Sequence, residues 1–240
     1  MCIRDSYQDR PCAVKQVLPG KTTPMYMNMF RDEMVLCAKL QHPSIIRFYG
    51  CSWEPPDVFI VLEFAEQGSL KDLLRREDMV VSLEDMTLRM AGEIASGMHY
   101  LHTRPRPVIH RDLKSDNVLV TASFAARLAD FGVSKETSKN TMGESFVGTP
   151  FWVAPEVGAG EKYTTKADVY SFAMILYNLY ASEPPWRGES GESAARHGIR
   201  GERPTLPRSW DQKVVDLIRN CWAHEPAERQ REAGEGGGGG

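Results

Sequence analysis

Cysteine is scarce in this sequence, and its spacing argues against two common uses of the residue. The five cysteines are odd in number, widely spread and free of C-x-x-C pairs, which disfavours a disulfide framework and a zinc site. A reducing compartment is therefore expected, and we predict a cytoplasmic protein. The cysteines are Cys2, Cys12, Cys37, Cys51 and Cys221.

Long apolar runs and an excess of one charge are also missing. The longest apolar stretches, VFIVLEF and SFAMILYNLYA, are shorter than the roughly 20 residues that cross a bilayer. The 29 basic residues nearly balance the 32 acidic residues and are mixed with them along the chain, so no basic patch for nucleic acid stands out. We predict neither a membrane span nor a nucleic-acid partner.

The hydrophobic pattern divides the chain into a strand-rich part and a helical part. Residues 11–18 and 45–64 are rich in β-branched and aromatic residues, which predicts short paired strands. Between them, residues 27–41 carry apolar side chains at helical spacing. The pattern is mostly helical after Ser82, and residues 166–181 are apolar on nearly every side, which indicates a helix buried at the centre of its lobe.

We therefore expect an α+β fold with two lobes. Residues 7–64 would form a small β-rich lobe and residues 65–230 a larger helical lobe, joined by a hinge near residues 63–68. The low-complexity tail, residues 231–240, cannot bury a core. The opening MCIRDS back-translates to a sequence that resembles a transposon end used in sequencing libraries, so we expect residues 1–6 to be a non-native leader. An ordinary start codon is the alternative.

A group of polar residues lies at the edge of the next predicted hairpin. Asn117 follows Asp112 by five residues, and residues 118–129 between Asn117 and Asp130 have the pattern of a hairpin. Such a hairpin brings Asp130 back beside Asn117. Two side-chain oxygens at the mouth of a strand pair suit Mg²⁺, while Asp112 is placed to accept a proton. Each residue taken alone could equally be an ordinary capped turn.

The same residues belong to a series of motifs that resembles a eukaryotic protein kinase of the serine/threonine type. Several of the motifs are weak alone, but their order is very specific. They span residues 12–229. In chain order they are CAVK at 12–15, Glu33, HRDLKSDN at 110–117, DFG at 130–132, GTPFWVAPE at 148–156, DVYSF at 168–172 and CWAHEPAER at 221–229.

The resemblance implies the cofactors ATP and Mg²⁺ and a catalytic role for several residues. Lys15 would contact the α and β phosphates and form an ion pair with Glu33. Asn117 and Asp130 would hold the magnesium ions. The catalytic loop would supply two further groups: Asp112 would orient and deprotonate the acceptor hydroxyl, and Lys114 would steady the γ-phosphoryl group.

The resemblance also implies an adenine pocket. Ala13 and Leu119 would sandwich the adenine, the backbone of Glu63 and Ala65 would hydrogen-bond its edge, and Leu62 would gate the back of the pocket. Plain core packing is an equally good interpretation of the apolar residues in this set.

Further positions are implied to be structural. Cys37, Phe48, His110 and Phe131 would stack through both lobes, so we expect His110 to be packed rather than catalytic. Outside that stack, Arg229 would form a buried ion pair with Glu156. Lys114 and the Gly148-Thr149-Pro150 segment resemble enzymes that act on serine and threonine, and the C-terminal motif resembles the tyrosine kinase-like group.

Regulation is implied by residues 130–156, the activation segment of such kinases. Arg111 would face this segment and bind a phosphate carried by it. We rank Ser145 first and Thr141 second as phosphorylation sites, added by an upstream activating kinase. Either hydroxyl could instead be a solvated loop residue.

The resemblance fails at one end. The glycine-rich loop that covers the ATP phosphates should begin about twenty residues before Lys15, so we expect it, the first strand and most of the second to be missing. The small lobe would then lack pairing at that edge. Two alternatives to an active kinase with protein substrates therefore stay open: a pseudokinase or scaffold that binds partners, and an inactive kinase fragment.

Overall fold

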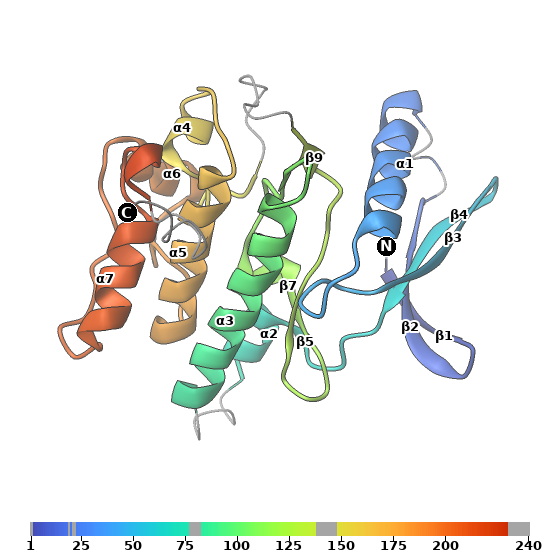
Figure 1. Ribbon diagram of the computed structural model, residues 1–240, viewed down its shortest axis with the longest axis horizontal. Coiled ribbons are helices and arrows are strands. Elements are labelled where there is room, and N and C mark those ends of the chain that lie inside the picture. The colour runs from blue at the N-terminus through green and yellow to red at the C-terminus, as the bar shows by residue number, and fades with distance from the viewer. Residues whose placement is uncertain (1, 19, 21–22, 77–82, 138–147, 230–240) are drawn as a thin grey trace, which may run out of the picture.

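A computed structural model describes residues 2–18, 20, 23–76, 83–137 and 148–229. Figure 1 shows a sheet and one helix at one end of the molecule and a helical lobe at the other, as expected for an α+β fold. A single strand-to-turn connection after residue 63 joins them. No helix in the described ranges has the length and apolar character needed to cross a bilayer.

The small lobe is an antiparallel sheet with one helix packed on it. The strands lie in the order β1-β2-β4-β3, and neighbouring strands are all antiparallel. Its elements are β1 (Cys2–Tyr7), β2 (Arg10–Gln16), α1 (Pro24–Lys39), β3 (Phe48–Glu54) and β4 (Asp57–Glu63). The chain order of strand, helix, strand, strand that the pattern predicted from residue 11 is confirmed.

Helix α1 begins three residues before the predicted segment because of its capping residues. The side chain of Thr23 accepts a hydrogen bond from the Tyr26 amide, and Pro24 occupies the first turn, where its missing N–H costs nothing. The apolar face of the helix packs on the sheet through Phe30 and Met34, in a cluster with Ile60. This packing fixes the helix against β4.

One edge of the sheet differs from the prediction. Strand β1 pairs with β2 along its whole length, from Cys2 opposite Lys15 to Tyr7 opposite Arg10. The expectation that this edge of the small lobe lacks pairing is therefore wrong for β2. That residues 1–6 are foreign to the gene stays a hypothesis, which reading the genomic locus across Ser6 tests.

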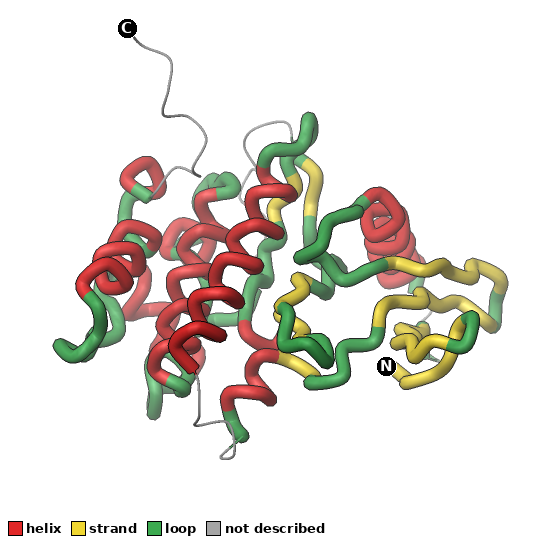
Figure 2. Tube along the Cα trace, turned by 60° about the horizontal axis from the view of Figure 1, so that its bottom comes forward, coloured by secondary structure: helices red, strands yellow, loops and turns green. Residues whose placement is uncertain are grey.

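The large lobe is built from helices and short strand pairs (Figures 1 and 2). Two small sheets, β5-β7-β8 and β6-β9, lie on the side that faces the small lobe. The elements are β5 (Gly68–Ser69), α2 (Leu70–Leu74), α3 (Leu83–His102), β6 (Val108–Ile109), η2 (Ser115–Asn117), β7 (Val118–Val120), β8 (Ala126–Leu128), β9 (Lys135–Glu136), α4 (Pro155–Gly158), α5 (Lys166–Ala181), α6 (Gly191–Ile199), α7 (Gln212–Cys221) and η3 (Pro226–Glu228).

Two structural predictions for this lobe are confirmed. Helix α5 is buried from Ala167 to Leu179 and lies among α3, α6 and α7 (Figure 1). Arg229 forms a buried bidentate ion pair with Glu156, with distances of 2.6 and 2.7 Å. The remaining guanidinium hydrogens of Arg229 go to backbone carbonyls, including that of Lys166 at 2.9 Å, so this buried charge is fully paired.

Candidate active site

A lysine from the small lobe meets carboxylates from both lobes. Lys15 Nζ on β2 lies 2.5 Å from Glu33 Oε1 on α1 and 2.9 Å from Asp130 Oδ1, which follows β8. Burial alone would lower the pKa of Lys15, but the two carboxylates raise it above its ordinary value. The ammonium therefore stays charged and joins the helix of the small lobe to the large lobe.

The backbone after β8 is shaped to present Asp130 at this point. Asp130 has a left-handed conformation with φ of 61°, which is uncommon for a residue other than glycine. A Cβ atom at Gly132 would lie 3.2 Å from Glu33 Oε2, so a side chain there would crowd the ion pair. Partial burial would raise the pKa of Asp130, but the nearby Lys15 ammonium, together with His110, lowers it below its ordinary value.

The stacked residues implied by the resemblance lie beneath this group. The rings of His110 and Phe131 have centroids 5.2 Å apart, and both side chains are buried. Cys37 is buried in the same core cluster, and Phe48 packs against the clusters of both lobes. His110 is therefore packed, as expected, and its Nε2 lies 3.1 Å from the Ala129 carbonyl.

Asp112 is the centre of a second polar group. Its Oδ2 accepts hydrogen bonds from Lys114 Nζ at 2.7 Å and from Asn117 Nδ2 at 3.0 Å. Its Oδ1 accepts one from the Thr149 hydroxyl at 2.8 Å. Asn117 Nδ2 also donates to the Asp112 carbonyl at 2.8 Å. Side chain and backbone of Asp112 are thus fixed by residues from the same loop and from the segment at 149.

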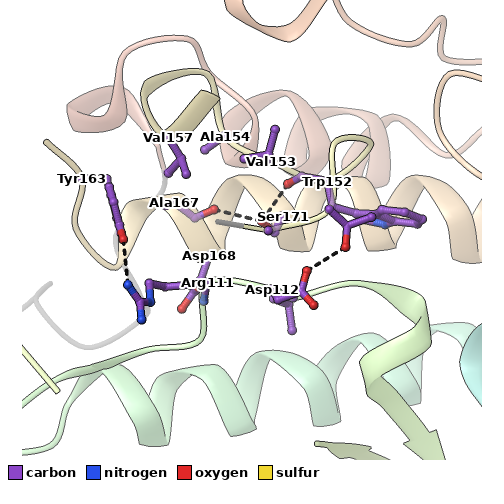
Figure 3. A pocket seen from close by; sticks show the side chains of 13 residues that line it. Arg111, Asp112, Trp152, Val153, Ala154, Val157, Tyr163, Ala167, Asp168 and Ser171 are labelled. Carbon is purple, nitrogen blue, oxygen red and sulfur yellow. Dashed lines mark hydrogen bonds between the residues drawn. The ribbon is translucent and has the colours of Figure 1, made fainter. Parts of the chain in front are cut away.

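The loop that carries Asp112 is tied to helix α5 by a buried carboxylate. Asp168 accepts the backbone N–H of His110 at 2.8 Å and of Arg111 at 3.0 Å, and it lies 2.8 Å from His102 Nε2. Burial alone would raise the pKa of Asp168, but His102 and His110 lower it below its ordinary value. Figure 3 shows Arg111, Asp112 and Asp168 among the residues that line a small pocket against α5.

The predicted hairpin forms and sets the spacing of Asn117 and Asp130. β7 and β8 pair with Val118 opposite Leu128, and the Ala129 amide donates to the Asn117 carbonyl at 2.9 Å. The two predicted metal ligands therefore leave adjacent strands at one edge. In this arrangement the side chain of Asn117 turns to Asp112, and that of Asp130 turns to Lys15.

The residues expected around adenine occupy both sides of the connection between the lobes. Ala13 lies opposite Leu62 in the pairing of β2 with β4, and Leu119 lies on β7 at the edge of the large core. Ala65 is buried. The Glu63 side chain accepts the Arg47 amide at 3.2 Å, and the Glu63 amide donates to the Arg47 carbonyl at 2.8 Å, so that amide is already used within the small lobe.

Comparisons with known proteins agree with this geometry. A sequence model of the protein tyrosine and serine/threonine kinase family matches residues 2–233. The chain belongs to this family. It is 36% identical over 229 residues to the serine/threonine-protein kinase CTR1 of Arabidopsis thaliana and 35% identical over 231 residues to the serine/threonine/tyrosine-protein kinase HT1 of the same plant. Each match covers 94% of this chain, but only 28% and 59% of the relatives' own lengths.

Two polar residues of this kinase domain were not assigned a role in the active site from the sequence. Thr149 bonds to both Asp112 and Lys114, the latter at 2.7 Å, and Asp168 holds the backbone on the other side. Both lie in motifs that the sequence displayed, GTPFWVAPE and DVYSF. The motifs mark Thr149 and Asp168 as candidates for a role. The residues that each side chain contacts are known only from the tertiary structure.

The structure describes only part of the segment that the predictions on regulation concern. Ser145 and Thr141 lie outside the described residues. Arg111 does face the start of the activation segment, since its Nε donates to the Val133 carbonyl. Its Nη1 lies 3.3 Å from the Tyr163 hydroxyl, and the two side chains point toward each other in Figure 3.

Proposed function

We propose that this kinase domain transfers the γ-phosphoryl group of ATP to serine and threonine hydroxyls of proteins in intracellular signalling. The observation that carries the proposal is that Asp112 is fixed by three donors beside the hairpin edge that presents Asp130 to Lys15. We assign Asp112 as the acceptor base and Lys15 as the phosphate-binding cation. The small and large lobes contribute one group each.

Nucleotide binding is supported by the charge state of Lys15. Its ammonium is kept positive by Glu33 and Asp130, and a positive point charge suits phosphate oxygens. Glu33 is buried and fixes the lysine, so we assign it a positioning role. Ala13, Leu62 and Leu119 would enclose the adenine, with the backbone of Glu63 and Ala65 at its edge.

The oxygens of Asn117 and Asp130 suit Mg²⁺. Asn117 donates its amide nitrogen to Asp112, which directs the amide oxygen elsewhere, and the lowered pKa of Asp130 keeps its half-exposed carboxylate charged. A hard cation that keeps water and phosphate oxygens in its shell needs few such protein ligands. When bound, the metal neutralises negative charge on the phosphates.

The chemical step assigned to this chain's residues is a proton transfer coupled to bond exchange. The acceptor hydroxyl loses its proton to the Asp112 carboxylate as its oxygen bonds to the γ-phosphorus, and the bond from that phosphorus to the ADP oxygen breaks. Lys114 lies 2.7 Å from Asp112, so its ammonium can balance charge on the transferred group. Thr149 holds Asp112 in position.

Transfer of radiolabelled phosphate to a generic serine and threonine substrate tests this function. The chain is compared with the Asp112→Asn variant and with Asp57→Asn, which changes an exposed strand residue. Loss of the base should lower the rate at least about 100-fold, while the control keeps the parent rate. Equal transfer by Asp112→Asn would remove Asp112 as the base, and transfer to tyrosine alone would overturn the assignment of the acceptor.

We further propose regulation by an upstream kinase, from the position of Arg111 beside the activation segment. A phosphate on Ser145, or on Thr141 in second place, would pair with a guanidinium and order the segment. Phosphopeptide mapping of active protein tests the ranking. Unmodified Ser145 in fully active protein would contradict it.

A further inference from the structure

A second pocket, of about 580 Å³, lies behind the connection between the lobes. It is bounded by the end of α1, the segment 40–47, the start of β3, the hinge residue Glu63 and Arg127 on β8. Among the residues assigned above to nucleotide binding or catalysis, Glu63 is the only one that lines this pocket. The volume lies within the range of small-molecule sites.

The lining combines an apolar wall with a cationic side. Leu40 and Ile45 are buried in the core, so the hydrophobic surface that a flat ligand could cover comes from half-buried Phe48 and from the exposed residues Ala38 and Pro43. Among the lining residues two arginines, Arg47 and Arg127, face one carboxylate, that of Glu63. The formal charge of this lining is therefore positive with His42 neutral.

The two guanidinium groups differ in how far they are already engaged. Arg127 Nε forms a long ion pair with Glu63 Oε2 at 3.8 Å, beyond hydrogen-bond range, and Arg127 Nη1 donates to the Ala126 carbonyl at 3.1 Å, so its Nη2 is the group left for a ligand. Glu63 Oε2 instead accepts the backbone N–H of Arg47 at 3.2 Å. The guanidinium of Arg47 is exposed and has no hydrogen-bond or ion-pair partner within the described part of the chain.

His42 adds a neutral donor to the same lining. Its Nδ1 accepts the Ser44 amide at 3.1 Å, so in the neutral ring the proton is on Nε2. Burial, followed by the charges of Arg127 and His99, lowers the pKa of His42 below its ordinary value. The ring is therefore neutral near pH 7, and the positive field of Arg127 reaches it.

We propose that this pocket binds a small organic anion with a flat apolar body and one carboxylate. The carboxylate pairs with Arg47 and Arg127, whose planar guanidinium groups suit carboxylate geometry. The body covers Ala38, Pro43 and Phe48.

We expect a ligand in this pocket to change the affinity of the cleft between the lobes for nucleotide. The pocket is lined by the end of α1, which carries Glu33, by the hinge residue Glu63, and by Arg127, three residues before Asp130. An anion that binds one arrangement of the lobes more tightly shifts nucleotide affinity, and nucleotide shifts anion affinity by the same factor. This coupling rests on the proposed function, whereas binding of the anion does not.

Calorimetric titration with 2-naphthoate tests the site, with 2-naphthalenemethanol as the uncharged body of the same shape. The carboxylate should bind more tightly than the alcohol, and Arg47→Gln should weaken it about tenfold, since one charge-assisted hydrogen bond is lost. Arg127→Gln should act in the same direction. Arg187→Gln, at a side chain that is 77% exposed on the large lobe, should leave the affinity unchanged.

A parallel titration in saturating ATP and Mg²⁺ shows whether the probe binds in this pocket or in the nucleotide cleft. Binding that persists with nucleotide present and still responds to Arg47→Gln supports the pocket, even if no phosphate is transferred. Absence of binding, equal affinity for acid and alcohol, or insensitivity to Arg47→Gln would overturn the proposal. Simple competition with ATP would place the probe in the adenine cleft and overturn it as well.

Discussion

At the scale of single residues, Asp112 shows how hydrogen bonds fix the orientation of a carboxylate. Three donors, from Lys114, Asn117 and Thr149, occupy its two oxygens. Two of them come from the same short loop, so the sequence placed them together. The third comes from a residue 37 positions away, and its contribution depends on the path of the activation segment.

Thr149→Val should lower the turnover rate about tenfold, because the variant keeps the shape of the side chain but loses a hydrogen bond to Asp112. The rate constant should fall more than the KM for ATP rises, since Thr149 contacts no residue assigned to adenine. Steady-state kinetics with a peptide substrate measure both. Thr149→Ser retains the hydroxyl and should recover most of the rate; if Ser and Val are equally slow, the hydroxyl is not the cause.

At the scale of elements, buried charge pairs connect helices to loops. Asp168 on α5 fixes the backbone of the loop before Asp112, and Arg229 after η3 fixes Glu156 on α4. Both acids are almost fully buried. A buried charge that loses its partner is costly, so these pairs determine whether the elements stay assembled.

Glu156→Gln should lower the free energy of unfolding by about 3 kcal/mol, because it leaves the buried guanidinium of Arg229 without a counter-charge. Urea denaturation at pH 7 measures this. Glu161→Gln, a few residues later and exposed, is the matched control and should change stability little. Equal stability of Glu156→Gln and the parent protein would show that the pair contributes no net stability.

The lowered pKa of Asp168 predicts how its contribution varies with pH. Because its folded pKa lies below the ordinary value of 3.8, its stabilising effect is fully present above that value and is lost as pH falls through the folded pKa. Asp168→Asn should therefore be less stable than the parent at pH 7, and the difference should shrink below about pH 4.

Parallel urea titrations at pH 7 and at the lowest pH where both proteins fold measure that difference. Asp216→Asn, on the surface of α7, serves as a control for general effects of removing a carboxylate. A difference that stays constant down to the acid limit would contradict the assigned pKa direction.

At the scale of the whole molecule, the cysteines report on the packing of both lobes. Burial raises the pKa of Cys37 in α1 to about 12 and that of Cys221 in α7 to about 11, so neither carries much thiolate at pH 8. Cys51 on β3 is exposed. Folded protein should therefore react with iodoacetamide at Cys51 and resist at the other two.

Peptide mass spectrometry after brief labelling at pH 8 gives the result for each site. Protein unfolded in urea is the control, and there Cys37 and Cys221 should be labelled as readily as Cys51. Rapid labelling of Cys37 alone in folded protein would show that α1 is not packed as described.

Much of this molecule follows from its sequence. The two lobes, the hairpin that brings Asn117 near Asp130, the buried helix at 166–181 and the pair of Arg229 with Glu156 were all predicted, because they depend on local periodicity or on motifs of fixed spacing. The pairing of β1 was missed, since strand partners are chosen by contacts distant in sequence and a six-residue segment carries little pattern of its own.

The sequence by itself determined which groups the chain carries and their order: a lysine, a helix acid and a loop with Asp112 and Asn117. The tertiary structure alone decided the contacts that no motif or periodicity had predicted. The Lys15 ion pair with Asp130 spans 115 positions, and the positive lining behind the hinge joins residues as far apart as Arg47 and Arg127. Such contacts arise when the lobes pack, because packing, and not local propensity, sets the distance between residues that the chain separates.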